Sequence, residues 1–275
     1  MHADRTLVMG ILNQTPDSFY DGGRTSLEES LGHARRMVEA GCDIVDVGGV
    51  KAGPGDPVSQ DEEIERVVPL IEALRGETEA ALSLETGRPE VALRVLAGGP
   101  AIVNDVTGLV EPELAHVCAD HEAELVVMHH GGQLRGRPRN PRYADVVRSV
   151  IETWDELTSV ALGRGMPAER LIYDPGLDFG KTTFHSLELM RRLGELTDGR
   201  RVLVAASRKD VVGETLDLPL DERLEGSLAL VALSVLHGAR IVRVHDVEES
   251  VRVVRMVEAV MGARPPAAPV RGLWE

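Results

Sequence analysis

Aromatic residues and positive charge are scarce in this chain. Only 3% of its 275 residues are Phe, Trp or Tyr, which argues against the aromatic stacking surfaces that bind single-stranded nucleic acid. The formal net charge of −15 argues against a nucleic-acid partner, because proteins that bind a phosphate backbone carry a basic face. An anionic ligand must therefore be held by cations gathered locally in a site.

Cysteines and long apolar runs are scarce as well. Cys42 and Cys118 are the two cysteines, and they lie far apart in no metal-binding spacing, which predicts reduced, buried thiols. No apolar run approaches the roughly 18 residues of a membrane span, and the N-terminus lacks the basic and then apolar pattern of a signal peptide. We therefore expect a cytoplasmic protein that has no membrane partner.

Short apolar segments alternate with amphipathic helical patterns along the chain. This alternation requires parallel strands with helical crossovers, and eight such units favour closure, so we predict one α/β domain over residues 1–275, a (β/α)₈ TIM barrel. An open doubly wound sheet is the alternative, but no GxGxxG pattern follows the first strand. The predicted strands are Leu7–Asn13, Asp43–Gly49, Ala80–Thr86, Ala101–Val106, Glu124–His129, Leu171–Gly176, Arg201–Ser207 and Ala239–Asp246. The predicted helices include Leu27–Ala40, Glu62–Arg75 and Tyr143–Arg164, and the Pro-rich segment Arg264–Pro269 is expected to end the last helix and wrap the surface.

Polar residues gather at the ends of the predicted strands. In a parallel barrel these ends all face one rim, where active sites of this architecture lie. Loops begin there, so single polar residues need no function, but eight consecutive polar ends favour a site. The residues concerned are Asn13, Asp46, Glu85, Asn104, Asp105, His129, His130, Asp174, Ser207, Arg208, Lys209, Arg243, His245 and Asp246.

The charges at this rim suit a flat heterocycle that also carries phosphate. The acceptors Glu85, Asn104 and Asp174 can bind the donor edge of a guanidine-like ring, because carboxylates accept in bidentate fashion. Cations on the neighbouring strands can hold ring oxygens or a phosphate. These cations are Lys209, Arg208, Arg243 and His245.

Several of these residues also have a purely structural interpretation. Asn13, with Asp17 and Asp21 in the loop that follows it, can hold a hard cation through oxygen ligands, but the two aspartates are equally common in turns. Asp46 is expected chiefly to fix the turn that follows its strand. His129 is as compatible with a hydrogen-bonded core position as with a ligand site.

Longer segments resemble a known family. Residues 9–23 (MGILNQTPDSFYDGG) closely resemble the first signature of dihydropteroate synthases, and residues 43–49 (DIVDVGG) resemble the start of the second. These and the further matches run in the family's order across nearly the whole chain. We therefore identify the chain as a member of this family that resembles its divergent second-copy actinobacterial paralogue. The further matching segments are 103–106, 174–181, 206–209, 226–229 and 241–246.

The resemblance implies a cytoplasmic, homodimeric TIM-barrel transferase of folate biosynthesis. Such an enzyme joins 6-hydroxymethyl-dihydropterin pyrophosphate to p-aminobenzoate, releases pyrophosphate and uses Mg²⁺. Residues with implied catalytic roles are Asn13, which is also the implied metal ligand, Asp21, Lys209, Arg243 and His245. Residues with implied substrate contacts are Glu85, Asn104, Met128, Asp174, Phe179 and Lys209 for the pterin, Arg243 and His245 for pyrophosphate, and Ser207 for p-aminobenzoate.

The chain departs from the family's pattern where the second substrate binds. The family continues its second signature with ESTRPG, whereas residues 50–55 read VKAGPG, so Ala52 and Gly53 replace a hydroxyl residue and an arginine. Glu85 replaces an aspartate, which moves the carboxylate by about 1.5 Å. Asp178 replaces a glycine. These departures leave two hypotheses open, a working synthase and a weak or inactive paralogue that binds a pterin or pyrophosphate or uses another amine.

Two other enzyme classes fit the sequence less well. A pterin-dependent methyltransferase is disfavoured, because the first loop has the synthase signature and no corrinoid partner domain is attached. A metal-dependent hydrolase is disfavoured too, because the first strand lacks the His-x-His pair that such barrels use.

Overall fold

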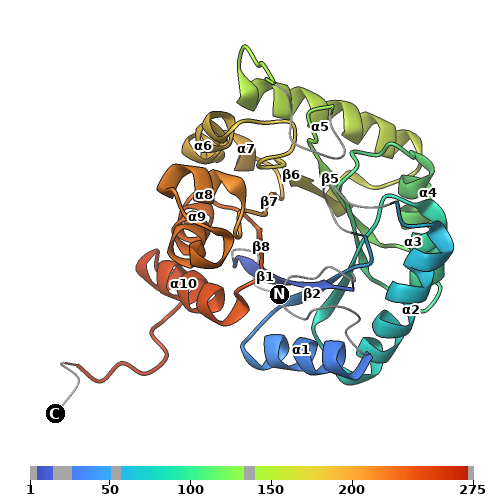
Figure 1. The fold of residues 1–275 in the computed structure, drawn as a ribbon, viewed down its shortest axis with the longest axis horizontal. Helices are drawn as coiled ribbons and strands as arrows, with labels where there is room; N and C mark the ends of the chain where they lie inside the picture. The colour runs from blue at the N-terminus through green and yellow to red at the C-terminus, as the bar shows by residue number, and fades with distance from the viewer. Residues whose placement is uncertain (1–4, 15–26, 51–56, 133–139, 272–275) are drawn as a thin grey trace.

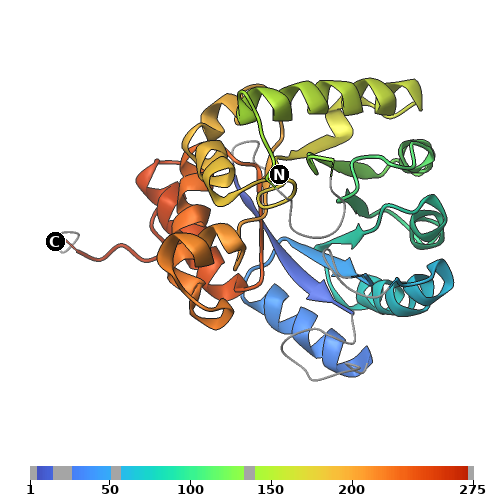
Figure 2. The same ribbon diagram turned by 45° about the horizontal axis from the view of Figure 1, so that its top comes forward.

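The computed structural model describes residues 5–14, 27–50, 57–132 and 140–271. Eight parallel strands follow the order β6-β5-β4-β3-β2-β1-β8-β7, and helices surround them (Figures 1 and 2). A bridge between Tyr173 and Val202 joins the two ends of the sheet, and the Tyr173 N–H donates to the Arg201 carbonyl at 2.9 Å. The predicted TIM barrel is therefore confirmed.

The strands are shorter than predicted at several of their ends. The largest difference is at β7, which covers two residues instead of Arg201–Ser207, so residues 205–209 belong to a loop. The strands are β1 Leu7–Asn13, β2 Ile44–Gly48, β3 Ala81–Glu85, β4 Ile102–Asp105, β5 Glu124–Met128, β6 Leu171–Asp174, β7 Leu203–Val204 and β8 Ile241–Val244.

The helices lie outside the barrel and begin at residues that can cap them. Ser59 accepts a hydrogen bond from the Glu62 N–H before α2, and Asp145 accepts two before α5, so this helix starts at Val146 rather than at Tyr143. No helix within the described residues is both long and apolar enough to cross a membrane. The α-helices are α1 Leu27–Glu39, α2 Gln60–Glu77, α3 Pro89–Leu96, α4 Glu113–Asp120, α5 Val146–Gly163, α6 Thr183–Arg191, α7 Leu193–Thr197, α8 Asp210–Leu216, α9 Leu224–Leu236 and α10 Val247–Val260, and the short 3₁₀ helices are η1 Ala168–Arg170 and η2 Leu220–Glu222.

The last helix ends earlier than expected, and the Pro-rich segment after it leaves the barrel. Helix α10 ends at Val260, four residues before Arg264. The segment beyond it extends away from the body of the molecule (Figure 1). The prediction that residues 264–269 end the helix and wrap the surface was therefore wrong.

The barrel interior changes from apolar to polar along four of the strands. Side chains at alternate positions of a barrel strand point inward. A buried apolar cluster forms the floor of the interior, and on β2, β4, β6 and β8 the next inward position carries a polar group. Examples of this change are Ile44 to Asp46, Ile102 to Asn104, Ile172 to Asp174 and Ile241 to Arg243.

The first strand packs tightly against the helices around it. A Cβ atom at Gly10 would lie 2.9 Å from a methyl carbon of Val247 and 3.1 Å from the Cys42 sulfur, so only glycine fits this position.

Cys42 and Cys118 are buried free thiols, as predicted. Burial raises the pKa of both thiols, that of Cys118 to about 12. Both cysteines are therefore packing residues, not nucleophiles.

Candidate functional site

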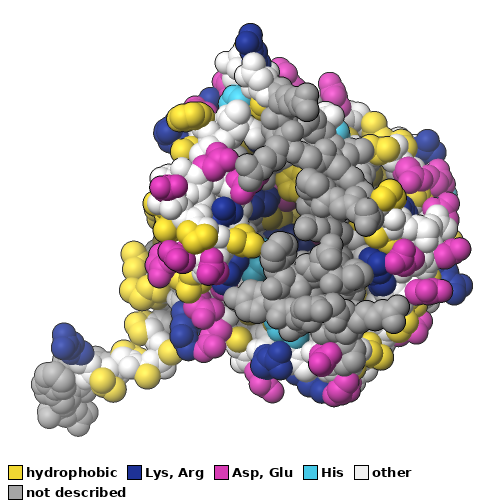
Figure 3. Space-filling model, viewed as in Figure 1, with side chains coloured by type: hydrophobic (Ala, Val, Ile, Leu, Met, Phe, Trp, Pro, Cys, Tyr) yellow, Lys and Arg dark blue, Asp and Glu magenta, His cyan; other side chains and the backbone are white. Residues whose placement is uncertain are grey.

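A network of charged side chains fills the mouth of the barrel around Arg243. Its Nε donates to Oδ2 of Asp46 at 2.6 Å, and its Nη2 donates to Oε2 of Glu85. Nδ2 of Asn104 donates to the same Asp46 oxygen at 3.1 Å. Four strands thus meet in one network, and Figure 3 shows Lys, Arg and His side chains at the centre of this face.

Burial shifts the pKa values of the charged groups in this network. The side chain of Arg243 is 14% exposed, that of Glu85 6% and that of Asp46 0%. Burial, together with the nearby Asp46 carboxylate, raises the pKa of Glu85 to about 7, although Arg243 opposes the shift. Burial alone lowers the pKa of Arg243, but Asp46 and Glu85 outweigh it and raise that pKa. One guanidinium therefore serves two carboxylates, and among the described residues Oδ1 of Asp46 has no hydrogen-bond partner.

Asp174, Lys209 and Phe179 form the neighbouring part of the site. Oδ1 of Asp174 accepts from the Gly176 N–H at 2.7 Å, and Nζ of Lys209 donates to the Leu177 carbonyl at 2.8 Å and lies 5.0 Å from the centre of the Phe179 ring. Burial raises the pKa of Asp174 and lowers that of Lys209, and each charge opposes the shift of the other. A donor and an acceptor are thus placed near one half-buried aromatic ring, which suits a flat polar heterocycle.

Met128 and Ser207 also lie at the positions that the sequence indicates. Met128 is fully buried at the end of β5, in register with Asp174. Ser207 is buried, and its Oγ accepts from the His245 N–H at 3.2 Å and lies 3.1 Å from Nδ1 of the same histidine. His245 itself is exposed at the rim. Ser207 therefore holds His245 in place where an anion can reach the ring.

Asn13 ends β1 at the rim, beside β2. Its side chain is exposed, and its Oδ1 would lie 3.3 Å from a Cβ atom at Gly48. Within the described residues, no three His, Cys, Asp or Glu side chains are grouped so as to hold a metal ion. Asn13 thus offers one oxygen, which fits Mg²⁺ that is bound mainly through waters and substrate phosphates. The remaining predicted oxygen ligands, Asp17 and Asp21, lie outside the described residues, as do Ala52 and Gly53.

Arg208 turns away from the cations that line the mouth. Its backbone is left-handed, with φ of 56°, and its N–H donates to Oγ of Ser227 at 2.9 Å. Its guanidinium forms a bidentate pair with Asp246, with distances of 2.9 and 2.6 Å. This pair joins the loop after β7 to the start of α10. Arg208 therefore stabilises the loop that carries Lys209.

Asp178, which stands where the family has glycine, has a left-handed backbone with φ of 69°. Its carboxylate accepts from Oγ of Ser186 at 3.0 Å and from the Val211 N–H at 3.1 Å. Asp tolerates this backbone better than most residues, since its short side chain forms such local bonds. The structure therefore explains why the substitution is accepted.

We expect Asp178→Ala to lower the free energy of unfolding by about 2–3 kcal/mol, through two lost hydrogen bonds and backbone strain. Asp178→Gly loses the same bonds without the strain, so its loss is expected to be smaller by about 1 kcal/mol. Urea denaturation of both variants measures the difference. Equal losses would contradict the strain argument.

Two buried ionic contacts, one in the site and one beneath it, were not predicted from the sequence. Asp46 does not fix a turn, because its side chain lies inside the barrel and pairs with Arg243; its period-two spacing from Ile44 was the available signal. Glu63 is buried beneath the rim, where it accepts from Oγ1 of Thr86 and from Nη1 of Arg88, both at 2.6 Å. Glu63 lies four residues before Val67, on the same buried face of α2, and this spacing was the sequence signal for its burial.

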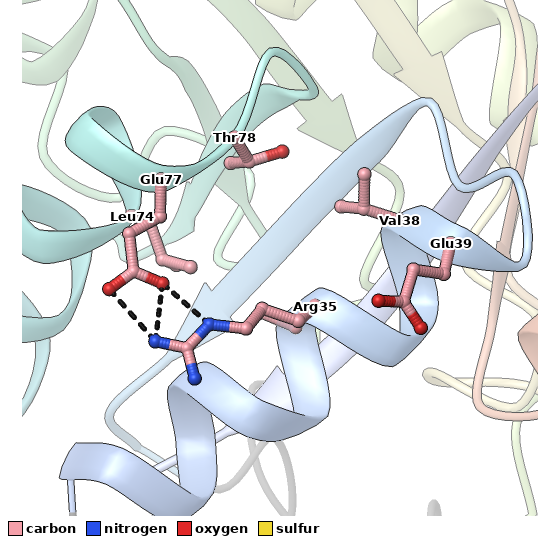
Figure 4. Close-up of a pocket in the computed structure, with 7 residues that line it drawn as sticks. Arg35, Val38, Glu39, Leu74, Glu77 and Thr78 are labelled. Carbon is pink, nitrogen blue, oxygen red and sulfur yellow. Dashed lines mark hydrogen bonds and ion pairs between the residues drawn. The ribbon is translucent and has the colours of Figure 1, made fainter.

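A pocket of about 150 Å³ lies elsewhere, between α1 and α2 (Figure 4). Arg35 crosses it to reach Glu77, with contacts of 2.8 and 3.0 Å. The pocket lies at the C-terminal ends of these helices, and therefore at the end of the barrel opposite the polar rim. It is separate from the charged network around Arg243.

Comparisons with known proteins agree with this geometry. The family model described as pterin binding enzyme matches residues 9–245. The chain is 46% identical over 278 residues to a Mycobacterium tuberculosis protein named inactive dihydropteroate synthase 2, covering 98% of this chain and 87% of the relative.

Solved structures of synthases are similar as well. Yersinia pestis dihydropteroate synthase, in complex with a sulfonamide drug, has a TM-score of 0.91 and 36% identity, covering 96% of this chain and 97% of the other. The Xanthomonas albilineans dihydropteroate synthase in complex with 7,8-dihydropteroate has a TM-score of 0.84 and 37% identity, covering 97% and 95%. With the matched family model and the barrel-mouth site, these similarities show that the chain belongs to the pterin-binding, dihydropteroate synthase family.

Proposed function

We propose that this protein binds a dihydropterin pyrophosphate in the barrel mouth and has weak or no dihydropteroate synthase activity. The observation that carries the proposal is the contact between Glu85 and Arg243. The family resemblance assigns Glu85 to the pterin and Arg243 to pyrophosphate. Here Nη2 of Arg243 and Oε2 of Glu85 contact each other, so each of these atoms must leave that contact to bind its ligand.

The cost of separating the pair supports low activity. Both side chains are largely buried, and separating two buried charges leaves each of them partly unpaired until the ligand replaces the contact. Binding energy spent on this separation does not stabilise a transition state. The mycobacterial relative that is named inactive points in the same direction.

The family resemblance assigns the remaining contacts. Asn104, Asp174 and Lys209 would hold the pterin ring, with Met128 and Phe179 as its apolar walls. His245 and Asn13 would face the pyrophosphate, and Ser207 the carboxylate of p-aminobenzoate. Mg²⁺ bound at Asn13 would supply positive charge that stabilises the leaving pyrophosphate.

A working synthase is the second candidate. It is favoured by the residues just named, which match the family's pattern, and by the similarity to proteins named dihydropteroate synthase. Binding of the pterin pyrophosphate is common to both candidates. Only the formation of dihydropteroate distinguishes them.

The test titrates the protein with dihydropterin pyrophosphate and Mg²⁺ by calorimetry and then adds p-aminobenzoate. We expect measurable binding heat and dihydropteroate formation at least about 100-fold slower than in a working synthase, the loss that a misplacement near 1 Å can cause. The same assay on the Yersinia pestis enzyme is the positive control. An equal rate would establish the second candidate, and absence of binding heat would reject both.

We also propose that the protein is a homodimer that associates through α9 and α10. These helices pack against each other, and their outer faces expose apolar side chains (Figure 3). Met256 is 63% exposed and Val260 73%, which is unusual for adjacent turns of a helix in a monomer. Neighbouring exposed residues are Leu233, Leu236 and Met261.

If this face is the dimer interface, Met256→Glu is expected to convert the dimer to a monomer. Burying an unpaired charge costs several kcal/mol, which exceeds what the surrounding contacts can offset. Sedimentation velocity measures the mass. Leu93→Glu is the matched control, because Leu93 is an exposed apolar residue on α3, and this variant should stay dimeric. A monomeric wild type would reject the proposal.

A further inference from the structure

A buried lysine, Lys181, lies beneath the loop that carries Phe179. The residue is 4% exposed, yet its Nζ lies within hydrogen-bond distance of four acceptors. These are Nδ1 of His129 at 2.7 Å and the carbonyl oxygens of His129 at 3.0 Å, Gly176 at 2.9 Å and Phe179 at 2.9 Å. No role assigned so far involves this ammonium.

The hydrogens on Nζ decide how many of these bonds can form. A charged ammonium has three N–H donors and no acceptor, so it can serve His129 Nδ1 and two or three carbonyls by sharing. A neutral amine has two N–H donors and a lone pair, so it can accept from Nδ1–H of His129 and still donate to two carbonyls, but without the charge that strengthens these bonds. The charged form therefore holds the loop more firmly than the neutral form.

The bonds of Lys181 join two loops that touch backbone to backbone. A Cβ atom at Gly176 would lie 2.1 Å from the His129 carbonyl oxygen, and one at Gly180 would lie 2.6 Å from the His130 carbonyl oxygen. Both glycines have positive φ, so the chain passes at closer range than other residues allow. Lys181 places its Nζ among the carbonyls of His129, Gly176 and Phe179.

We propose that Lys181 is a positioning residue that ties the loops after β5 and β6 together and thereby sets the place of the Phe179 ring in the pterin site. The inference rests on the proposed function. Phe179 is held at both sides: its carbonyl binds Lys181, and its ring lies under Lys209. Loosening the first contact moves the ring relative to Lys209 and Asp174.

Other titratable groups surround Lys181 and define its pH behaviour. His129 and His130 lie at the end of β5, and burial lowers the pKa of both, that of His129 to about 3, so both are neutral near pH 7. Burial likewise lowers the pKa of Lys181 to about 7, opposed by the charges of Asp174 and Asp178 and aided by that of Lys209. Tyr143 and His185 flank the same loop, and burial raises the pKa of the tyrosine and lowers that of the histidine. The charged form of Lys181 is thus lost as the pH rises through about 7.

The test compares the affinity of wild type and Lys181→Met for dihydropterin pyrophosphate across pH. The variant keeps the shape of the side chain but has no charge. We expect it to bind about tenfold more weakly near pH 6, roughly the worth of one charge-assisted hydrogen bond, and by a smaller factor near pH 9, where wild-type Lys181 is neutral but keeps two N–H donors. Ionisation of the ligand and of Glu85 acts on both proteins and cancels in the ratio.

Tyr143→Phe is the matched control. It removes the 2.7 Å hydrogen bond from the Tyr143 hydroxyl to the Gly180 carbonyl, in the same loop, without changing charge. Its affinity relative to wild type should be constant across pH. A constant ratio for Lys181→Met as well would show a purely structural role and overturn the inference.

A second measurement needs no ligand. The Phe179 N–H donates to the Gly176 carbonyl at 3.0 Å inside the clamped loop. Its hydrogen exchange in wild type should become faster, relative to Lys181→Met, as the pH rises through about 7. If the wild type does not bind the pterin but its hydrogen exchange shows this pH dependence, the proposed function is rejected. The role of Lys181 in tying the two loops together is then retained. Equal hydrogen exchange of the Phe179 N–H in the two proteins at all pH values would overturn that role of Lys181.

Discussion

Arg243→Met is expected to lower the free energy of unfolding by about 3–5 kcal/mol near pH 8, the usual cost of removing one partner from a buried ion pair. The variant leaves Asp46 and Glu85 as two buried carboxylates without their shared cation. It also removes a proposed contact to pyrophosphate. Urea denaturation and calorimetry with pyrophosphate measure the two effects.

The stability loss in Arg243→Met should depend on pH in a defined direction. The pKa of Glu85 is raised from its ordinary 4.5 to about 7 in the wild type, and removal of Arg243, which opposes that shift, raises it further. Stability from a group with a raised pKa is fully present below its unfolded value and is lost as the pH rises through its folded value. The loss should therefore be smaller near pH 5 than near pH 8.

Two variants test the origin of this effect. Adding Glu85→Gln to Arg243→Met should recover part of the stability near pH 8, because one buried charge is removed. Arg88→Met breaks the similar buried pair with Glu63 outside the site, so it should destabilise the protein while pyrophosphate affinity stays within about twofold. A pH-independent loss in Arg243→Met would contradict the network described above.

Glu85→Asp is expected to increase the affinity for pyrophosphate about tenfold, or about 1.4 kcal/mol. Shortening the side chain by one methylene withdraws the carboxylate by about 1.5 Å and lengthens its contact with Arg243 beyond hydrogen-bond range. The guanidinium stays bound to Asp46 but presents Nη2 to the ligand. Calorimetric titration with Mg²⁺-pyrophosphate measures the gain.

The matched control for Glu85→Asp is Glu63→Asp. Glu63 is also buried and paired with an arginine, Arg88, but it lies outside the network around Arg243. This control should leave pyrophosphate affinity unchanged. No gain in Glu85→Asp would mean that the Glu85 contact does not limit anion binding.

Recovery of synthase turnover should require more than Glu85→Asp. The sequence also replaces a hydroxyl residue and an arginine by Ala52 and Gly53. We expect Glu85→Asp combined with Ala52→Thr and Gly53→Arg to form dihydropteroate faster than either change alone, since an arginine fork binds anions in a way that a point charge cannot. Full recovery by Glu85→Asp alone would show that positions 52 and 53 are not limiting.

The barrel and its polar rim were predictable because both follow from periodic patterns. Alternation of strand and helix fixes a parallel sheet, and polar residues at strand ends then meet at one rim whatever the details of packing. The pairing of Arg243 was not predictable in this way. Arg243 and Glu85 are 158 residues apart, and their contact depends on how far each side chain reaches across the barrel.

Local backbone geometry accounts for the other differences. Arg208 and Lys209 are consecutive, and only the left-handed backbone at Arg208 sends one toward Asp246 and the other toward Phe179. The sequence pattern does not distinguish this turn from a continued strand, so residues 205–207 were predicted to belong to β7. Lys181 belongs to a segment that resembles the family, but its burial among carbonyls depends on how the loops pack.

A crystal structure of the protein with dihydropterin pyrophosphate and Mg²⁺ tests the central claim most directly. We expect a pterin ring between Asp174, Lys209 and Phe179, with Glu85 moved away from Arg243 and accepting a hydrogen bond from the ring. The Arg243 guanidinium should keep its bond to Asp46 and donate Nη2 to the pyrophosphate. A bound ligand with the Glu85–Arg243 contact intact, or a ligand outside the barrel mouth, would contradict the account.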